Sequence, residues 1–229
     1  MDEFAESGEN FFLAYGLYRP HLPFVAPKKY YDLYDINDFS VPESSDAYLQ
    51  TLPKPAAASL RARKEQLNLD PTLAATIKHA YYATTTFMDA QIGRVLDKLK
   101  ETALDKNTII VFTSDHGYHL GEHGHWQKQT LFDNATRVPL IFSYPGIQKK
   151  GVKCEAPVEL IDVYPTIMDL VNIDVPKHVV GKSLKPIIDN EIESGRSSAL
   201  TRWKNGYSIK TKRYRFIGWK FDGKLGHEL

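Results

Sequence analysis

Asp115 and His116 are the residues of this sequence whose types and position most directly suggest chemistry. A carboxylate and an imidazole are both good ligands for a divalent metal ion. The pair follows the apolar run Thr108–Thr113, and in open α/β sheets reactive residues gather just beyond the carboxyl ends of the strands. Taken alone, the pair also fits an aspartate that caps a turn beside a histidine that packs passively. The residues that follow favour the functional interpretation.

Four of the eight histidines lie between positions 116 and 125. Such a density is typical of metal binding or of acid–base chemistry. Gly121 and Gly124 would weaken a helix, so we expect a loop to carry this cluster. Lys128 follows a few residues later. A lysine that reaches back to the loop would offer positive charge to an anionic ester oxygen, whereas most lysines near a loop are simply solvated.

A further candidate is His21, which stands between Pro20 and Pro23. The two prolines predict a stiff extended loop that holds the histidine, because proline fixes its own φ and restrains the residue before it. The apolar run Phe11–Tyr15 predicts a strand buried on both faces, as in a parallel sheet. His21 would then lie beyond a second central strand and converge with Asp115 on one crevice, where an imidazole can protonate a leaving group or stabilise an oxyanion. A purely structural role fits equally well.

The elements that would position these residues alternate between helix and strand. Apolar residues at helical spacing predict a long amphipathic helix over Pro71–Lys100, with Asp70 as its cap. Apolar runs predict strands at 108–113 and 138–143, and Asp162 can cap a helix that runs to about residue 171. This order predicts an α/β fold, part of a largely parallel sheet sandwiched by helices.

The chain is expected to divide into a core, residues 1–180, and a small antiparallel β subdomain, residues 181–229. Alternating polar and apolar residues predict a hairpin of strands 206–211 and 214–219. Residues 24–70 are rich in Pro, Ser and Ala and predict an irregular excursion. Basic residues of the hairpin region could form an anion patch but more often form the solvated face of an edge sheet; they are Lys204, Lys210, Lys212, Arg213 and Arg215.

Composition excludes several classes of protein. The formal net charge is +1 over 229 residues, which disfavours a nucleic-acid partner. No apolar run approaches the ~20 residues that span a bilayer, so we expect no membrane. The first ten residues contain four acids and no base, unlike a secretory signal, and the compartment is not indicated. Cys154, the single cysteine, is expected to be a buried or semi-buried spectator. The sequence contains no Gly-x-Ser-x-Gly and no P-loop.

Several motifs together resemble the sulfatase family, within the alkaline-phosphatase-like superfamily. They follow the family order along nearly the whole chain: Phe11-Phe12-Leu13-Ala14, Pro20-His21-Leu22-Pro23, Tyr81–Ala83, Met88–Leu96, Thr113–Gly117, Gly121-Glu122-His123-Gly124, Val138–Ile141 and Asp162–Thr166. Further segments are similar to the iduronate-2-sulfatase branch and its bacterial relatives: Trp126–Lys128, Phe132–Thr136, Gly206–Thr211 and Tyr214-Arg215.

The resemblance implies a role for each candidate. Asp115 and His116 match part of a metal site, usually calcium, although imidazole alone would suit zinc better. His21 matches the histidine that faces the sulfate and the leaving oxygen, and Lys128 matches a lysine that contacts the sulfate. His125 and Trp126 are candidates for substrate contact. The implied substrate is a sulfated carbohydrate, as in glycosaminoglycan degradation.

One departure from the family is large. Sulfatases carry an amino-terminal Cys/Ser-x-Pro-Ser-Arg whose first residue becomes formylglycine, and an early Asp-Asp pair that completes the metal site. Neither occurs here. The chain therefore resembles the carboxyl-terminal half of a sulfatase, whether a truncated reading frame, a processed chain or one piece of a two-chain enzyme. Its expected partner is the missing amino-terminal half. The alternatives are a phosphate or phosphonate monoester hydrolase of the same superfamily, or a non-catalytic fragment.

Overall fold

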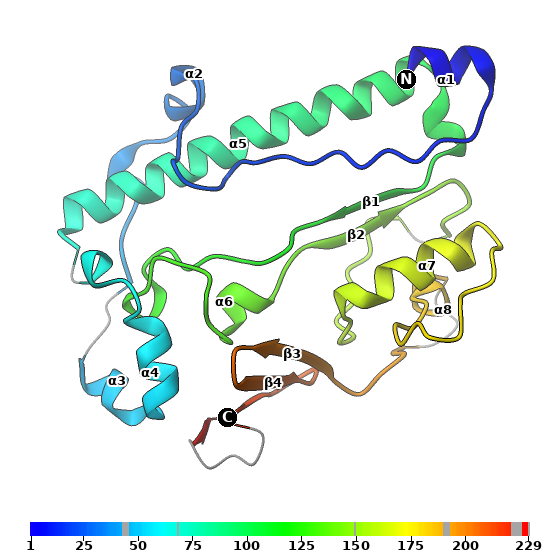
Figure 1. The fold of residues 1–229 in the computed structure, drawn as a ribbon. Helices are drawn as coiled ribbons and strands as arrows, with labels where there is room; N and C mark the ends of the chain where they lie inside the picture. The colour runs from blue at the N-terminus through cyan, green and yellow to red at the C-terminus, as the bar shows by residue number, and fades with distance from the viewer. Residues whose placement is uncertain (43–45, 68, 149, 190–192, 221–225, 229) are drawn as a thin grey trace. The chain divides into compact units, whose positions relative to one another are not determined.

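The computed structural model describes residues 1–42, 46–67, 69–148, 150–189, 193–220 and 226–228 (Figure 1). The chain forms two compact units that interleave along the sequence. Unit 1 comprises Met1–Ser44, Arg63–Thr108 and His119–Trp126, and unit 2 comprises Ser45–Ala62, Ile109–Tyr118 and Gln127–Leu229. The domain boundary expected at residue 180 remains a prediction. Within the described residues, no helix has both the length and the apolar character needed to cross a bilayer.

Unit 1 is organised along the long helix α5 (Pro71–Glu101), which confirms the helix predicted from the sequence. The carboxylate of Asp70 caps its first turn by accepting from the backbone N–H groups of Thr72 (2.9 Å) and Leu73 (3.2 Å). Proline at the first helical position has no N–H group, so no donor there is left without a hydrogen-bond partner. Local sequence signals therefore suffice to start this helix.

Aromatic side chains pack the amino-terminal segments onto α5. The ring of Phe24 meets that of Tyr81 edge-on at 5.4 Å, and Tyr34 meets Tyr82 at 5.6 Å. The Tyr34 hydroxyl also hydrogen-bonds Thr86 Oγ1 at 2.5 Å. The short elements of this unit are α1 (Asp2–Ser7), α2 (Lys28–Tyr31), η1 (Ile36–Asp38), η2 (Lys64–Gln66), η3 (Leu104–Asn107) and η4 (Glu122–Gly124).

The strand expected at Phe11–Tyr15 is absent, and this prediction was wrong for the described chain. The segment follows α1 as an extended trace along α5, drawn in blue in Figure 1, with Phe12 85% exposed. An apolar run becomes a strand only when another strand satisfies its N–H and C=O groups. No described residue pairs with it.

Unit 2 contains a two-stranded antiparallel ribbon of β1 (Ile110–Thr113) and β2 (Leu140–Ser143). Ile110 pairs with Ser143 and Thr113 with Leu140. Both strands lie where the apolar runs predicted them. Their direction differs from the expected parallel sheet, because an apolar run indicates burial and not the orientation of its neighbour. The described strand pairs are all antiparallel.

The carboxyl-terminal sheet has the order β3-β4-β5-β6 and is antiparallel throughout. The predicted hairpin is confirmed as β4 (Gly206–Lys210) and β5 (Arg215–Trp219), and the flanking strands are β3 (Ala199–Trp203) and β6 (His227–Glu228). A buried cluster joins this sheet to the rest of unit 2; its members are Ala56, Leu131, Ile217 and Trp219. Ala56 comes from α4 (Lys54–Leu60), which follows α3 (Asp46–Thr51). The 24–70 region therefore holds short helices rather than only irregular chain.

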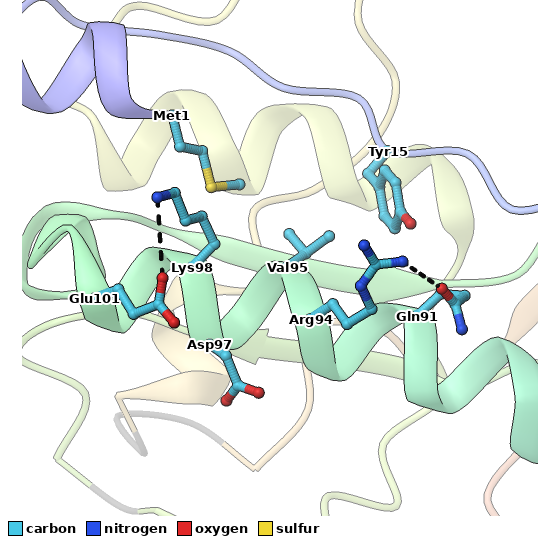
Figure 2. Close-up of a pocket in the computed structure, with 8 residues that line it drawn as sticks. All are labelled: Met1, Tyr15, Gln91, Arg94, Val95, Asp97, Lys98 and Glu101. Atoms are coloured by element: carbon cyan, nitrogen blue, oxygen red, sulfur yellow. Dashed lines mark hydrogen bonds and ion pairs between the residues drawn. The ribbon is translucent and has the colours of Figure 1, made fainter.

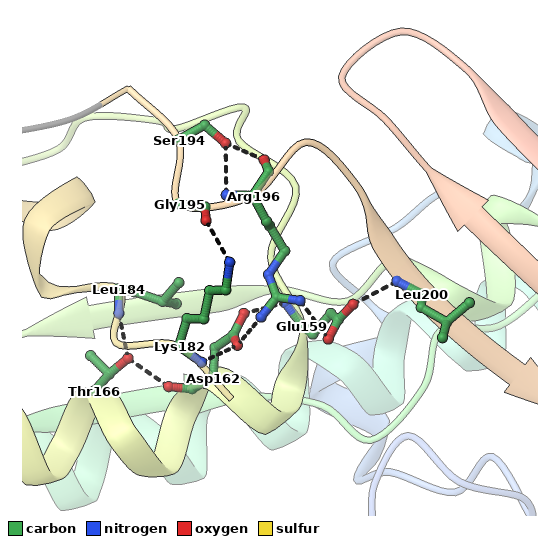
Figure 3. Close-up of polar contacts among 9 residues, drawn as sticks. All are labelled: Glu159, Asp162, Thr166, Lys182, Leu184, Ser194, Gly195, Arg196 and Leu200. Carbon is green, nitrogen blue, oxygen red and sulfur yellow. Dashed lines mark hydrogen bonds and ion pairs between the residues drawn. The ribbon is translucent and has the colours of Figure 1, made fainter. Parts of the chain in front are cut away.

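The helix expected after Asp162 is α7 (Val163–Leu170), but Asp162 does not cap it with its side chain. The carboxylate instead accepts from the N–H of Glu159 (2.9 Å), at the start of the 3-10 turn η5 (Leu160–Asp162), and from the N–H of Lys182 (2.8 Å). The guanidinium of Arg196 forms ion pairs with the carboxylates of Glu159 and Asp162 (Figure 3). The fully buried Asp162 thus ties its own turn to Lys182, which precedes α8 (Lys185–Ile188), and to Arg196, which lies between α8 and β3.

Cys154 is exposed, so the expectation of a buried cysteine was wrong. It lies in a stretch without helix or strand, and such connecting segments run over the surface. Its sulfur accepts a weak hydrogen bond from the N–H of Ala156 (3.5 Å).

Candidate functional site

The Asp115–His116 pair follows β1 after one residue, Ser114, in unit 2. His116 Nδ1 lies 2.8 Å from the carbonyl oxygen of Gly117, so this nitrogen carries the proton and donates it. Nε2 is left with its lone pair available to a ligand. The His116 N–H also donates to Asp115 Oδ1 (3.0 Å), which orients the carboxylate. Both side chains are therefore fixed locally by backbone contacts.

The spacing of the Asp115 and His116 donor atoms allows both to bind one divalent cation, but their number is too small for a complete ligand set. Asp115 Oδ2 and His116 Nε2 are 3.6 Å apart, and two neighbouring ligands at about 2.3 Å from an ion would lie roughly 3.3 Å apart. The Asp115 side chain is 86% exposed, so its oxygens are open to a ligand. Calcium takes about 6–8 oxygen ligands, however, and the described residues form no group of three or more potential metal ligands. Asp115 and His116 would therefore supply only a minority of the ligands that a calcium ion binds.

Gly117 docks the loop onto the short helix α6 (Asp133–Thr136). Its N–H donates to the carbonyl oxygen of Ala135 (2.8 Å). A Cβ at this position would lie 2.1 Å from the Asn134 carbonyl oxygen, a distance that no real contact reaches. Only glycine therefore allows the loop to approach α6 this closely.

Lys128 lies in the same unit, at the start of the segment that leads into α6. Its carbonyl oxygen accepts from the N–H of Thr130 (2.8 Å). Thr130 and Leu131 are both buried. The side chain is half-buried, and among the described residues the structure records no ion pair for it. The backbone of this segment is thus anchored, and the contact of the Lys128 ammonium group with an anion stays a prediction.

His21 belongs to unit 1 and lies in a turn rather than in the expected extended loop. Its N–H donates to the Tyr18 carbonyl (3.0 Å), and the Arg19 side chain hydrogen-bonds the carbonyls of His21 (3.2 Å) and Val25 (3.1 Å). Its Nδ1 lies 2.9 Å from the Leu22 carbonyl oxygen, the same arrangement as at His116. The expectation that His21 is held is confirmed. Its convergence with the unit 2 residues stays a prediction.

The histidine-rich stretch forms a tight loop in unit 1, as its glycines indicated. Gly121 and Gly124 adopt φ values of 103° and 66°, and the Gly121 N–H donates to the His125 carbonyl (3.0 Å). The rings of His119 and His125 meet edge-on at 4.9 Å. Burial lowers the pKa of His123, against the opposing charge of Glu122.

The two residues predicted to contact substrate are buried within this chain. His125 is 2% exposed and Trp126 is 4% exposed. Both therefore contribute to packing around the loop. Their contact with substrate remains a prediction.

Sequence reasoning missed an ionic cluster beside α6. Asp133 accepts from Arg215 Nε (2.7 Å), and Lys210 Nζ lies 3.4 Å from its second oxygen. Burial alone would raise the pKa of Asp133, but the Arg215 and Lys210 charges hold it below its usual value. Arg215 is only 13% exposed, so the expectation that it belongs to a solvated face was wrong. The alternation of β4 and β5 could have revealed it, because Lys210 pairs with Arg215 on the face of the buried Ser208.

A separate open groove lies on unit 1, against α5 (Figure 2). Its lining includes Arg94, which donates to Gln91 (2.9 Å), and Lys98, which lies 3.9 Å from Glu101. None of the candidate site residues lines it. The groove is therefore distinct from the candidate site.

Comparison with known proteins gives one consistent family. The profile of the family described as "Sulfatase" matches residues 1–173, and that of "N-sulphoglucosamine sulphohydrolase, C-terminal" matches residues 121–226. A protein named "Sulfatase" from Formosa agariphila is 36% identical over 216 residues, covering 90% of this chain and 41% of that protein. Human "Iduronate 2-sulfatase" is 32% identical, covering 96% of this chain and 54% of that protein.

Among solved structures, the phosphonate monoester hydrolase from Silicibacter pomeroyi is similar, with a TM-score of 0.78 and 30% identity. The match covers 88% of this chain and 46% of that one. The phosphonate monoester hydrolase of Agrobacterium radiobacter shares the fold, with a TM-score of 0.76 at 24% identity. The chain spans about half the length, or less, of these relatives.

Proposed function

The chain belongs to the sulfatase family, and we propose that it forms the carboxyl-terminal part of a sulfuric ester hydrolase that acts on sulfated sugars. The observation that carries this proposal is the match of the sulfatase profile to residues 1–173, a stretch that contains all the candidate site residues. Similarity to human iduronate 2-sulfatase over 96% of the chain supports a 2-O-sulfated uronic acid as the first substrate to examine.

Each candidate residue has a chemical role that its local geometry allows. The ammonium group of Lys128 offers positive charge to sulfate oxygens, and a hydrogen-bond donor there lowers the energy of developing negative charge. In its doubly protonated form His21 can pass the Nε2 proton to the leaving alkoxide, while its Nδ1–H stays hydrogen-bonded to the Leu22 carbonyl.

Asp115 and His116 would hold part of a divalent cation site, with calcium as the ion that the family implies. The cation, when bound, supplies positive charge beside the sulfate group, and formylglycine, expected on the amino-terminal part, supplies the attacking oxygen. The contribution of this chain is to fix Asp115 Oδ2 and His116 Nε2 at a separation that one ion can span.

The test is hydrolysis of an aryl sulfate and of a 2-O-sulfated uronic acid disaccharide. The chain is produced alone and together with an amino-terminal part from the same coding region, in cells that contain the formylglycine maturation machinery. We expect turnover only by the pair, and loss of that turnover in Asp115→Ala. A pair that is folded but inactive on every sulfate ester would reject the proposal and favour a non-catalytic fragment.

A second candidate function is hydrolysis of phosphonate or phosphate monoesters. The similarity to the Silicibacter pomeroyi phosphonate monoester hydrolase, at 30% identity and a TM-score of 0.78, favours it. Sulfate and phosphonate esters both present anionic oxygens that Lys128 could contact. A phenyl phosphonate monoester assayed beside the aryl sulfate distinguishes the two, through the ratio of their kcat/KM values.

A further inference from the structure

The segment that joins Lys128 to α6 is held by the carboxyl-terminal sheet through two kinds of contact. Leu131 is fully buried in the cluster that contains Ile217 and Trp219 of β5. Two residues later, Asp133 receives Arg215 Nε at 2.7 Å and Nη2 at 2.5 Å. A guanidinium that bonds one carboxylate with two nitrogens fixes direction as well as distance.

Arg215 is itself fixed at its other end. Its Nη1 donates to the hydroxyl of Ser208, a fully buried residue of β4. Lys210, directly opposite Arg215 in the β4–β5 register, adds a second positive charge to Asp133. The half-exposed carboxylate of Asp133 is therefore oriented by two basic side chains of the β4–β5 hairpin.

The other side of α6 receives the Asp115–Gly117 loop. Gly117 donates to the Ala135 carbonyl, and its α-carbon approaches the Asn134 carbonyl too closely for any side chain. A shift of α6 would therefore displace Gly117, whose carbonyl oxygen accepts the proton of His116 Nδ1. A continuous set of contacts thus runs from Arg215 through Asp133 and α6 to His116.

We infer that Arg215 is a positioning residue for the Asp115–Gly117 loop and that it acts through Asp133. Residues that orient metal ligands from outside the ligand shell typically change metal affinity or activity by about 10–100-fold when they are replaced. The catalytic part of this inference rests on the proposed sulfatase function. Its structural part does not.

The experiment compares Arg215→Gln with Arg215→Lys, which keeps the charge but loses the guanidinium fork, and with Arg213→Gln as a control. Arg213 stacks over the ring of Tyr214 at 5.0 Å and has no recorded contact with Asp133. The first readout is hydrogen exchange of the Gly117 amide in the full chain. The buried amide of Leu184, which donates to Thr166 Oγ1 (2.8 Å), reports wider opening of unit 2.

We expect the Gly117 amide of Arg215→Gln to exchange at least about tenfold faster while the Leu184 amide is unchanged, with Arg215→Lys intermediate and Arg213→Gln like the parent. In the pair that includes the amino-terminal part, the calcium concentration that gives half-maximal activity should rise about 10–100-fold. A merely structural role would accelerate both amides together and leave the calcium requirement unchanged.

Unchanged exchange at Gly117 in folded Arg215→Gln overturns the inference. If Arg215→Gln does not fold, exchange of the Gly117 amide is measured in Arg215→Lys and Asp133→Asn, and unchanged exchange in these variants overturns the inference. If the assembled pair has no activity on sulfate esters, the proposed function fails, and the exchange of Gly117 still decides the positioning role.

Discussion

At the scale of single residues, Gly117 is a position where the neighbouring backbone leaves no room for a side chain. A Cβ there would lie 2.1 Å from the Asn134 carbonyl oxygen and 3.1 Å from that of Arg137. We expect Gly117→Ala to lower the free energy of unfolding by about 1–3 kcal/mol, as overpacking does, measured by urea denaturation. Gly93→Ala, in the interior of α5 with open space around it, is the control. It should raise stability by up to about 1 kcal/mol, and equal effects of the two substitutions would contradict this account.

Also at the residue scale, two donors do not make a strong calcium site. Asp115 and His116 supply one carboxylate and one imidazole, and calcium prefers about 6–8 oxygens. We therefore expect the chain alone to bind calcium weakly in titration calorimetry, with a dissociation constant well above the micromolar range. Binding in the low-micromolar range that survives Asp115→Ala would show that other residues, such as Glu122 or His123, act as ligands.

At the scale of elements, the sequence predicts what is locally encoded. The helix α5 was predictable because its cap, proline and apolar spacing are all contained in Asp70–Glu101. The positions of β1 and β2 were predictable, whereas their antiparallel pairing was not, since it depends on a partner far along the chain. The prolines around His21 correctly predicted a restrained backbone, but the observed turn was expected to be an extended loop. Arg215 escaped prediction because its partner, Asp133, is 82 residues away.

The clamp around Arg196 gives an element-scale prediction. Arg196 is 14% exposed and pairs with Glu159 at 2.7 Å and with the fully buried Asp162 (Figure 3). Arg196→Met leaves two carboxylates without their cation, and breaking a buried pair in this way typically costs about 3–5 kcal/mol of unfolding free energy. Lys28→Met, which removes an exposed ion pair with Asp32, is the matched control and should leave stability unchanged. Similar denaturation midpoints for both variants would contradict a stabilising clamp.

The lowered pKa of Asp133 makes another element-scale prediction, for acid stability. Because the folded pKa lies below the ordinary value of 3.8, the ionised group stabilises the fold fully above that value. This contribution is lost as the pH falls through the lowered pKa. The stability difference between the parent and Asp133→Asn, measured by urea denaturation, should be constant near neutral pH and shrink below pH 3.8. A difference that grows on acidification would mean that Asp133 is not stabilised by Arg215 and Lys210.

At the scale of the whole molecule, the buried cluster crosses the proposed boundary at residue 180. Ala56 and Leu131 lie before the boundary, and Ile217 and Trp219 lie after it. Part of the apolar core therefore comes from each side, so the carboxyl-terminal sheet and the Leu131 segment should depend on each other for stability. Such dependence is the physical basis on which the sheet would influence the Asp115–Gly117 loop, where the proposed metal ligands lie.

The last prediction is that residues 1–180 expressed without the sheet lose the order of unit 2. Removing Ile217 and Trp219 exposes Leu131, which is otherwise fully buried, and removes the cation that holds Asp133. We expect rapid proteolysis within residues 109–118 and 127–180 and fast exchange of the Gly117 amide. In the full chain, Trp219→Ala should reproduce the direction of this change and cost about 3–5 kcal/mol of unfolding free energy. A truncated chain that keeps the protease resistance of unit 2 would instead establish residues 181–229 as an independent domain and remove the physical basis for the role given to Arg215.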